Sequence, residues 1–189
     1  EPNSIYHIYN QGNNRQPIFF KEENYLFFLR KMREHLLPYG DLLCYCLMPN
    51  HFHWLFFVRQ TTVGVTQSHA DSGALRNLND SIGILLRSYT RAINRQEDRS
   101  GALFREKTKA KDGWENPNLP PAHPNYQKLL REWDLYGATC FGYIHDNPRR
   151  AGLVKQAEDW PYSSCADFAG IRKGTLCNQI LARELLGLP

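Results

Sequence analysis

The order of the predicted elements indicates an α+β protein of the ferredoxin-like βαββαβ type, with an antiparallel sheet and helices on one face. Stretches with strand character and stretches with helical spacing follow one another as strand, helix, strand, strand, helix, strand, helix. The chain of 189 residues is long enough for one domain. Its 42% hydrophobic and 22% charged residues are ordinary for a globular protein and exclude wholesale disorder.

The first half of the chain supplies a strand, a helix and a hairpin. Residues 5–10 are rich in aromatic and β-branched side chains, which favours a strand. Apolar residues between 25 and 36 follow helical spacing, and a Pro-Tyr-Gly sequence ends this helix. Residues 41–48 and 51–58 are two further strand candidates, and the Pro-Asn turn between them predicts a hairpin.

The second half adds two longer helices and one strand. The polar residues 60–72 predict a loop, and apolar spacing predicts a helix over 75–95. Residues 102–110 are the fourth strand candidate, and a last long helix is expected over 126–147, before a proline. Residues 112–124 contain four prolines and predict a loop or inserted segment.

We therefore expect a main domain over residues 1–154 and a small C-terminal extension over 155–189. No apolar run approaches the roughly 18 residues that span a bilayer, which predicts a protein without membrane association. The five cysteines show no CxxC spacing, which argues against a disulfide framework and favours a reducing cytosol.

Positive charge is concentrated in one part of the chain. The net charge is +4, but residues 85–111 carry eight basic and three acidic side chains, a local charge of +5. Arginines at every fourth position form a stripe on one helix face, provided that the helix continues to Arg99. The following lysines alternate along a strand. Such a surface resembles one that tracks phosphates, whereas a solvated helix face is the ordinary alternative. The residues that we interpret as DNA-binding here are Arg87, Arg91, Arg95, Arg105, Lys107, Lys109 and Lys111.

Two histidines stand two positions apart on the third predicted strand. Residues with this spacing project from the same face, so His51 and His53 point one way and Phe52 the other. Two neighbouring imidazoles can bind one divalent metal. The alternative is a pair of hydrogen-bonded histidines on a half-buried strand.

A tyrosine and an asparagine share a face of the last long helix. Tyr143 and Asn147 are four residues apart, close to the proline that follows. A carboxamide oxygen is a suitable third ligand beside two imidazoles, and the hydroxyl of Tyr143 could then face the metal. The alternative is that Tyr143 packs in the core and Asn147 caps the helix.

Together these residues predict a reaction on DNA. A metal held by His51, His53 and Asn147 could polarise a phosphodiester, and Tyr143 could attack its phosphorus. The products would be a covalent 5′-phosphotyrosine and a free 3′ hydroxyl.

The motifs resemble those of a known family, the REP-associated tyrosine transposases, which are HUH-type single-tyrosine transposases. PNHFHWLF (49–56) is similar to the family's His-hydrophobe-His motif, and FGYIHDNPRRAGLV (141–154) to its YxxxNPxxAGL segment. Residues 6–19 resemble the N-terminal strand and turn of the family, and WPYSS (160–164) resembles its WPxSS element. The resemblance covers nearly the whole chain in the family's order.

The resemblance implies a ferredoxin-like fold, Mg²⁺ or Mn²⁺ as cofactor, and cleavage and joining of single-stranded DNA near hairpins. By position it makes His51, His53 and Asn147 the metal ligands and Tyr143 the nucleophile. We also count Arg15, Arg149 and Arg150 as DNA-binding residues. The proline-rich insertion departs from the family's pattern. We expect a cytoplasmic, nucleoid-associated protein that acts as a monomer or as a homodimer.

Two other functions are compatible with the same residues. One is a nucleic-acid-binding regulator that has lost catalysis, which would bind DNA without forming an adduct. The other is a metal-dependent hydrolase in which water attacks and Tyr143 only packs.

Overall fold

A computed structural model describes residues 1–65, 74–112 and 126–189 of the chain. Its centre is a four-stranded antiparallel sheet in the order β2-β3-β1-β6. The strands are β1 (Ser4–Gln11), β2 (Gly40–Met48), β3 (His51–Val58) and β6 (Lys109–Asp112). The antiparallel α+β arrangement confirms the predicted fold class.

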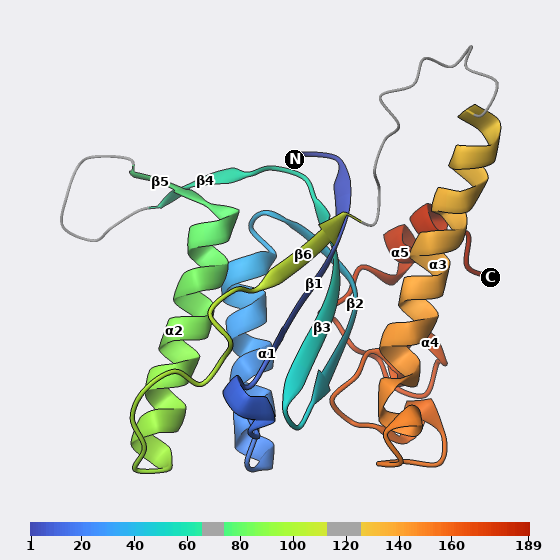
Figure 1. The fold of residues 1–189 in the computed structure, drawn as a ribbon. Coiled ribbons are helices and arrows are strands. Elements are labelled where there is room, and N and C mark those ends of the chain that lie inside the picture. The colour runs from blue at the N-terminus through green and yellow to red at the C-terminus, as the bar shows by residue number, and fades with distance from the viewer. Residues whose placement is uncertain (66–73, 113–125) are drawn as a thin grey trace.

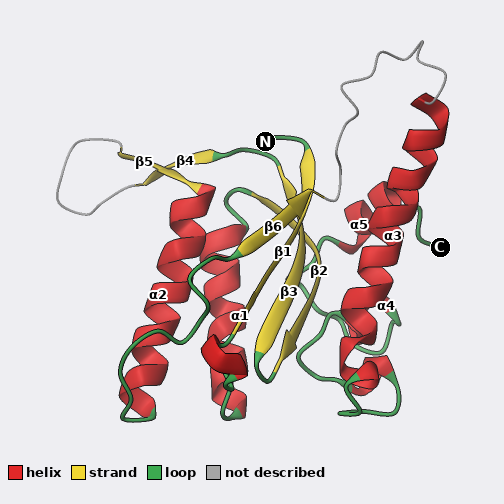
Figure 2. Cartoon of the chain, in the orientation of Figure 1, coloured by secondary structure: helices red, strands yellow, loops and turns green. Residues whose placement is uncertain are grey.

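Helices cover both faces of this sheet (Figure 1). The two helices within the βαββαβ order, α1 (Glu22–Leu36) and α2 (Leu78–Gln96), share one face, as the sequence predicts. The long helix α3 (Tyr126–Arg150) lies on the opposite face. Figure 2 shows how the sheet separates these two helical layers. In the described part of the chain, no helix is long and apolar enough to cross a membrane.

Strand β3 shows why the two faces differ. Phe52, Trp54 and Phe56 are completely buried and belong to the core beneath α1 and α2. The alternate positions of the strand face α3, where Leu55 joins a second apolar cluster with Ile144 of that helix. The period of two along a strand thus places the histidines of β3 on the α3 side.

The C-terminal segment covers the outer edge of β2. It contains the turns and helices η2 (Ala157–Asp159), α4 (Cys165–Phe168) and α5 (Gln179–Leu186). Backbone N–H groups of Leu47 and Ser164 donate to the carbonyls of Tyr162 and Tyr45, respectively. All nine residues of β2 are buried, because the edge is covered as well as both faces. The division at residue 154 into a main domain and an extension stays a prediction.

The prediction of a loop over residues 60–72 is wrong in its first part. Strand β4 (Thr62–Val65) pairs antiparallel with β5 (Ala74–Asn77), which leads directly into α2. The β-branched residues of β4 suit a strand, but its paired residues in β5 lie 9 to 15 positions further along the chain, without a short turn signal between them. Residues 66–73 lie outside the described ranges.

The fourth strand is shorter than predicted. Only the end of the expected 102–110 segment enters β6, and residues 101–108 are irregular apart from one isolated bridge between Gly12 and Phe104. The N–H of Arg105 donates to the carbonyl of Gln11, and the side chain of Asn10 donates to the carbonyl of Arg105. These bonds replace a regular ladder and hold the segment beside the end of β1.

The arginine stripe also ends earlier than the prediction requires. Helix α2 ends at Gln96, and Asp98 has a positive φ of 45°, so the chain turns away before Arg99. Helix α3, in contrast, runs past Asn147 through Pro148 to Arg150. The proline-rich segment starts at the last residue of β6 and otherwise lies outside the described residues.

Candidate active site

A pocket of about 230 Å³ opens on the α3 face of the sheet, at the end of β1 and the beginning of β3. We call it the histidine pocket. It is lined by Tyr9, Asn10, Gln11, His51, His53, Arg105, Lys107, Lys109 and Tyr143. Two of the predicted metal ligands and the predicted nucleophile therefore border one cavity, together with basic side chains from the segment that leads into β6.

His51 is the first residue of β3, and its ring orientation is fixed by the preceding turn. The amide nitrogen of Asn50 donates to the carbonyl of Arg15, so its Oδ1 atom faces the Nδ1 atom of His51 at 2.7 Å. An amide oxygen only accepts hydrogen bonds, which assigns the proton of a neutral His51 to Nδ1. The Nε2 lone pair remains available to a metal ion.

His53 has a partner that the sequence analysis missed. The Nδ1 atom of His53 lies 2.9 Å from the Nε2 atom of His7 on β1, and their rings stack with centroids 5.1 Å apart. Both side chains are buried. Burial lowers the pKa of His53 to about 3 and that of His7 to about 4, with nearby positive charge adding to the effect. Both imidazoles are therefore neutral at pH 7, the form that binds metals.

Tyr143 reaches the pocket from α3. Its ring lies edge-on to His53, with centroids 5.5 Å apart, and 42% of the residue is exposed. The guanidinium carbon of Arg150 is 5.9 Å from the centre of the same ring. The phenol is thus held beside the histidines while its surface stays accessible to a large substrate.

Asn147 lies one helical turn beyond Tyr143 and hydrogen bonds to His51. Burial lowers the pKa of His51, and this hydrogen bond partly opposes the effect. The Nδ2 atom of Asn147 donates to the carbonyl of Tyr143 at 2.8 Å, and its Oδ1 atom can only accept hydrogen bonds. Helix α3 therefore brings a carboxamide oxygen to the imidazoles.

These donors fit a divalent cation. Two neutral imidazoles and a carboxamide oxygen have lone pairs and no charge, and three protein ligands leave coordination positions open for a substrate. Within the described ranges, no group of three histidine, cysteine or carboxylate side chains forms a metal site. A metal site here accordingly depends on Asn147 as the third protein ligand.

The predicted DNA-binding residues fall into several groups. Arg105, Lys107 and Lys109 line the histidine pocket, and Lys111 lies opposite His7 in the register of β6 with β1. Arg15 is exposed beside the Asn50 turn. Arg149 instead pairs with Asp146 on its own helix, at 2.6 Å.

The arginines of α2 lie apart from the histidine pocket. Arg87 and Arg91 line a second cavity between α2 and residues 101–108. Arg95 is exposed in the last turn of the helix and does not line that cavity. The stripe that the sequence predicts is therefore divided between a concave site and the open surface.

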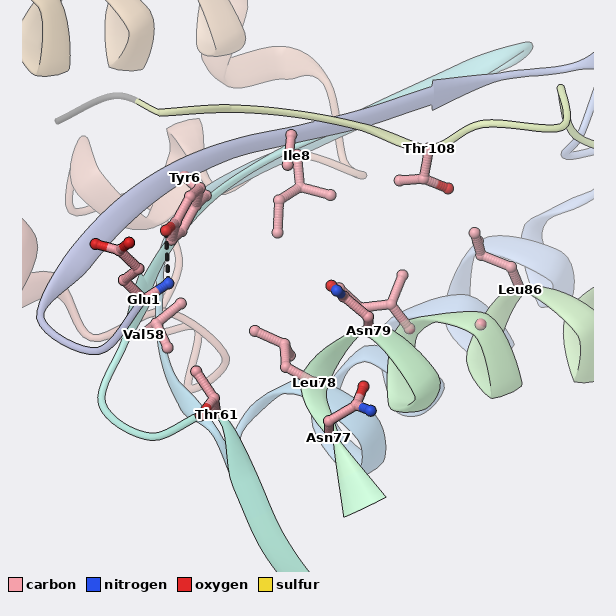
Figure 3. A pocket seen from close by; sticks show the side chains of 13 residues that line it. Glu1, Tyr6, Ile8, Val58, Thr61, Asn77, Leu78, Asn79, Leu86 and Thr108 are labelled. Carbon is pink, nitrogen blue, oxygen red and sulfur yellow. Dashed lines mark hydrogen bonds between the residues drawn. The ribbon is translucent and has the colours of Figure 1, made fainter. Parts of the chain in front are cut away.

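A larger cavity lies elsewhere, between α2 and the opposite face of the sheet. It has a volume of about 570 Å³, and its walls include Tyr6 and Ile8 of β1 and Leu78 and Leu86 of α2 (Figure 3). None of the candidate ligands or Tyr143 lines it. Its lining includes the phenol of Tyr6 but no histidine, lysine or arginine side chain that could hold a metal ion or a phosphate, so the smaller histidine pocket is the better candidate active site.

Comparisons with known proteins identify the fold. No family model matches the chain, and no curated protein has a matching sequence. A solved structure of a REP-associated tyrosine transposase bound to a REP hairpin does match, with a TM-score of 0.53. The match covers 94% of this chain and 93% of that chain at 14% sequence identity.

The chain has the fold of a REP-associated tyrosine transposase. This finding confirms the predicted resemblance at the level of the fold, over nearly the full length of both chains. The roles of individual residues in this protein stay predictions, because a likeness at this identity concerns the fold alone.

Proposed function

We propose that this protein is a metal-dependent transposase that cleaves and rejoins single-stranded DNA through a covalent 5′-phosphotyrosine on Tyr143. The observation that carries the proposal is the meeting of Tyr143 with His53 in one basic pocket, with Asn147 hydrogen-bonded to His51. The fold shared with a transposase bound to a hairpin supports the choice of DNA hairpins as substrates.

In this reaction Tyr143 supplies the attacking oxygen. Its Oη forms a bond to phosphorus, the bond from phosphorus to the 3′ oxygen breaks, and the phenolic proton is lost as the leaving oxygen gains one. Mg²⁺ or Mn²⁺ on His51, His53 and Asn147 would supply Lewis-acid stabilisation of the phosphate and leaving oxygens. Arg105, Lys107 and Lys109 would hold the neighbouring phosphates.

The phosphotyrosine bond conserves the energy of the broken phosphodiester. A free 3′ hydroxyl that enters the pocket can attack the same phosphorus, which restores the phenol and joins two strands. Since Tyr143 and the histidines of one chain already share a pocket, this proposal needs no exchange of α3 between two copies.

The test is covalent capture of DNA. A fluorescent single-stranded oligonucleotide with a foldback, incubated with protein and Mn²⁺ or Mg²⁺, should give a labelled protein band on a denaturing gel. Tyr143→Phe should abolish this band because the attacking oxygen is gone. Tyr136→Phe, on the same helix but outside the pocket lining, is the matched control and should keep it.

Other outcomes of this experiment would indicate a different nucleophile or a different function. An adduct that persists in Tyr143→Phe and disappears in Tyr9→Phe would move the nucleophile to the second phenol of the pocket. Cleavage without an adduct, unaffected by Tyr143→Phe, would indicate a hydrolase that uses water. Tight DNA binding with neither cleavage nor adduct in any divalent metal would indicate the regulator.

A further inference from the structure

The cavity beside the arginines of α2 has the features of a second binding site. It has a volume of about 410 Å³, within the usual range for ligand pockets, and lies between α2 and residues 101–108. We call it the arginine cleft. Arg87, Arg91 and Arg105 form its charged wall, and Leu86, Leu103 and Phe104 form its apolar part.

A narrow ridge separates the arginine cleft from the histidine pocket. Asn10 and Arg105 line both cavities, so the two lie back to back across this ridge. On the ridge, Lys107 belongs to the histidine pocket, whereas Glu106 and Thr108 belong to the cleft. A nucleic acid strand that crosses the ridge at Arg105 would therefore contact both cavities.

The ridge is irregular in backbone but firmly held. The Nδ2 atom of Asn10, a residue only 5% exposed, donates to the carbonyl of Arg105 at 3.2 Å and to the hydroxyl of Thr108 at 2.9 Å. The side chain of Gln16 donates to the carbonyl of Leu103 at 3.0 Å. A buried asparagine thus fixes a segment that no regular ladder holds, and this keeps Arg105 at a set position between the cavities.

The charge of the cleft is not balanced within the described part of the chain. Arg87, Arg91 and Arg105 are exposed, and no described carboxylate lies within ion-pair distance of them. Glu106 is the single acidic residue among the lining residues. Three guanidinium groups beside an apolar floor match a nucleotide, which combines an anionic phosphate with a flat base.

The cleft also continues along the helix. Gly83, Leu86 and Thr108 line both the arginine cleft and the large cavity, and Figure 3 shows Leu86 and Thr108 on opposite walls of the space between α2 and β6. A strand bound in the cleft would therefore have room to continue away from the histidine pocket.

We propose that the arginine cleft binds a nucleotide of single-stranded DNA within two positions of the phosphate attacked in the histidine pocket. Arg87 and Arg91 contact its phosphates, Arg105 bridges the two cavities, and the base lies against the apolar floor. The inference rests on the proposed function, because it places the cleft on the path of the cleaved strand.

The first test measures binding in a protein that cannot react. With Tyr143→Phe as background, the affinity for fluorescein-labelled (dT)20 is measured by anisotropy across a series of salt concentrations. Each phosphate contact to a single strand contributes about 0.7 to the slope of log K against log salt. Arg91→Ala should lower the slope by about this amount, whereas Arg30→Ala, an exposed arginine on α1 that does not line the cleft, should not.

The second test locates the nucleotide. A foldback oligonucleotide carries one 4-thiothymidine at a varied distance from the cleavage position, and irradiated complexes are digested and mapped by mass spectrometry. Cross-links to residues 86–91 or 102–106 are expected from substitutions within two nucleotides of the scissile phosphate. Cross-links confined to other segments, or equal salt slopes for Arg91→Ala and Arg30→Ala, would contradict the proposal that the arginine cleft binds a nucleotide.

The two proposals fail separately. Absence of a covalent adduct in the wild-type protein counts against the proposed function, while binding and cross-linking of the Tyr143→Phe protein still report on the cleft. An adduct in the wild type without cross-links in the cleft overturns only the inference made here.

Discussion

The two faces of the central sheet perform different tasks although they are built from the same strands. On one face, β3 presents Phe52 and Trp54 to α1 and α2, in a core that excludes water. On the other face, the same strand presents His51 and His53 to α3 and an open pocket. A strand can therefore be anchored by one face while its other face borders an open pocket.

Anchoring has a consequence for the geometry of the site. A side chain on β3 can be held within a few tenths of an ångström only if the strand itself does not move, and the packed face provides that rigidity. Polar groups on the α3 face are then positioned by a few hydrogen bonds, such as the one between His7 and His53. Variants that remove a packed side chain from one face can therefore be compared with variants that remove a hydrogen bond from the other.

The largest effect should come from the packed face. Phe52 is completely buried between Phe28 and Trp54, so Phe52→Ala should lower the free energy of unfolding by about 3–5 kcal/mol through lost burial and a residual cavity. Urea unfolding followed by circular dichroism measures this loss. A change below 1 kcal/mol would show that this face does not anchor the strand.

The comparison of faces also shows what the sequence could predict. Alternation placed His51 and His53 on one face of a strand, and the four-residue spacing placed Tyr143 beside Asn147, because both signals are local. His7 had no such signal: a single histidine in a strand gains a role only through the register of β1 with β3.

The irregular conformation of the ridge, residues 101–108, could not be predicted from the sequence either. Its alternating lysines resemble a strand, but the buried side chain of Asn10 and the backbone of Gln11 take up its polar groups instead. Hydrogen bonds between residues nearly a hundred positions apart decide this conformation, and no window of sequence contains both partners.

The next effect concerns His7 and should appear in metal binding rather than in folding. Partners that orient a metal-binding histidine typically contribute 10- to 100-fold in metal affinity. His7→Phe should weaken Mn²⁺ binding by about this factor, because it removes the hydrogen bond to His53 but keeps a ring in the stack. Titration calorimetry with Mn²⁺ on the Tyr143→Phe protein measures the change without turnover.

Two further variants complete this test. His7→Gln retains a group that can hydrogen bond to His53 and should recover part of the affinity, while His51→Ala removes a proposed ligand and should abolish binding. Equal Mn²⁺ affinity in His7→Phe and the parent protein would contradict a positioning role for His7.

A smaller effect comes from a polar group on the α3 side that supports structure alone. Burial raises the pKa of Asp41, but hydrogen bonds from Arg59 and Asn178 outweigh it, so the net pKa is lowered. Because the pKa of Asp41 is lower in the folded protein than its unfolded value of 3.8, the ionised carboxylate stabilises the fold at pH values above 3.8. This contribution to stability is lost as the pH falls through the folded pKa.

Asp41→Asn should therefore cost about 1 kcal/mol at pH 7, and the difference from the wild type should shrink below about pH 4. Urea unfolding at pH 7, 5 and 3 measures this dependence. Glu34→Gln, which removes an exposed pair with Lys31, is the control and should cost no more than about 0.5 kcal/mol. A constant difference at all three pH values would contradict the ionic contribution of Asp41.

The smallest effect tests whether the arginine cleft is kept open at the expense of helix stability. Gly83 lies inside α2, where alanine is favoured over glycine by about 0.5–1 kcal/mol, and an added Cβ would meet the Nη1 atom of Arg87 at 2.9 Å. Because that atom ends a flexible side chain, it can move, so Gly83→Ala should raise the free energy of unfolding by about 0.5 kcal/mol or more. The same variant should weaken binding of (dT)20 by displacing Arg87 from the cleft.

Gly142→Ala on α3, where a Cβ meets open space, is the control and should gain helix stability with no change in binding at the cleft. A Gly83→Ala protein that is more stable and binds (dT)20 as tightly as its parent would show that the glycine serves no purpose in the cleft.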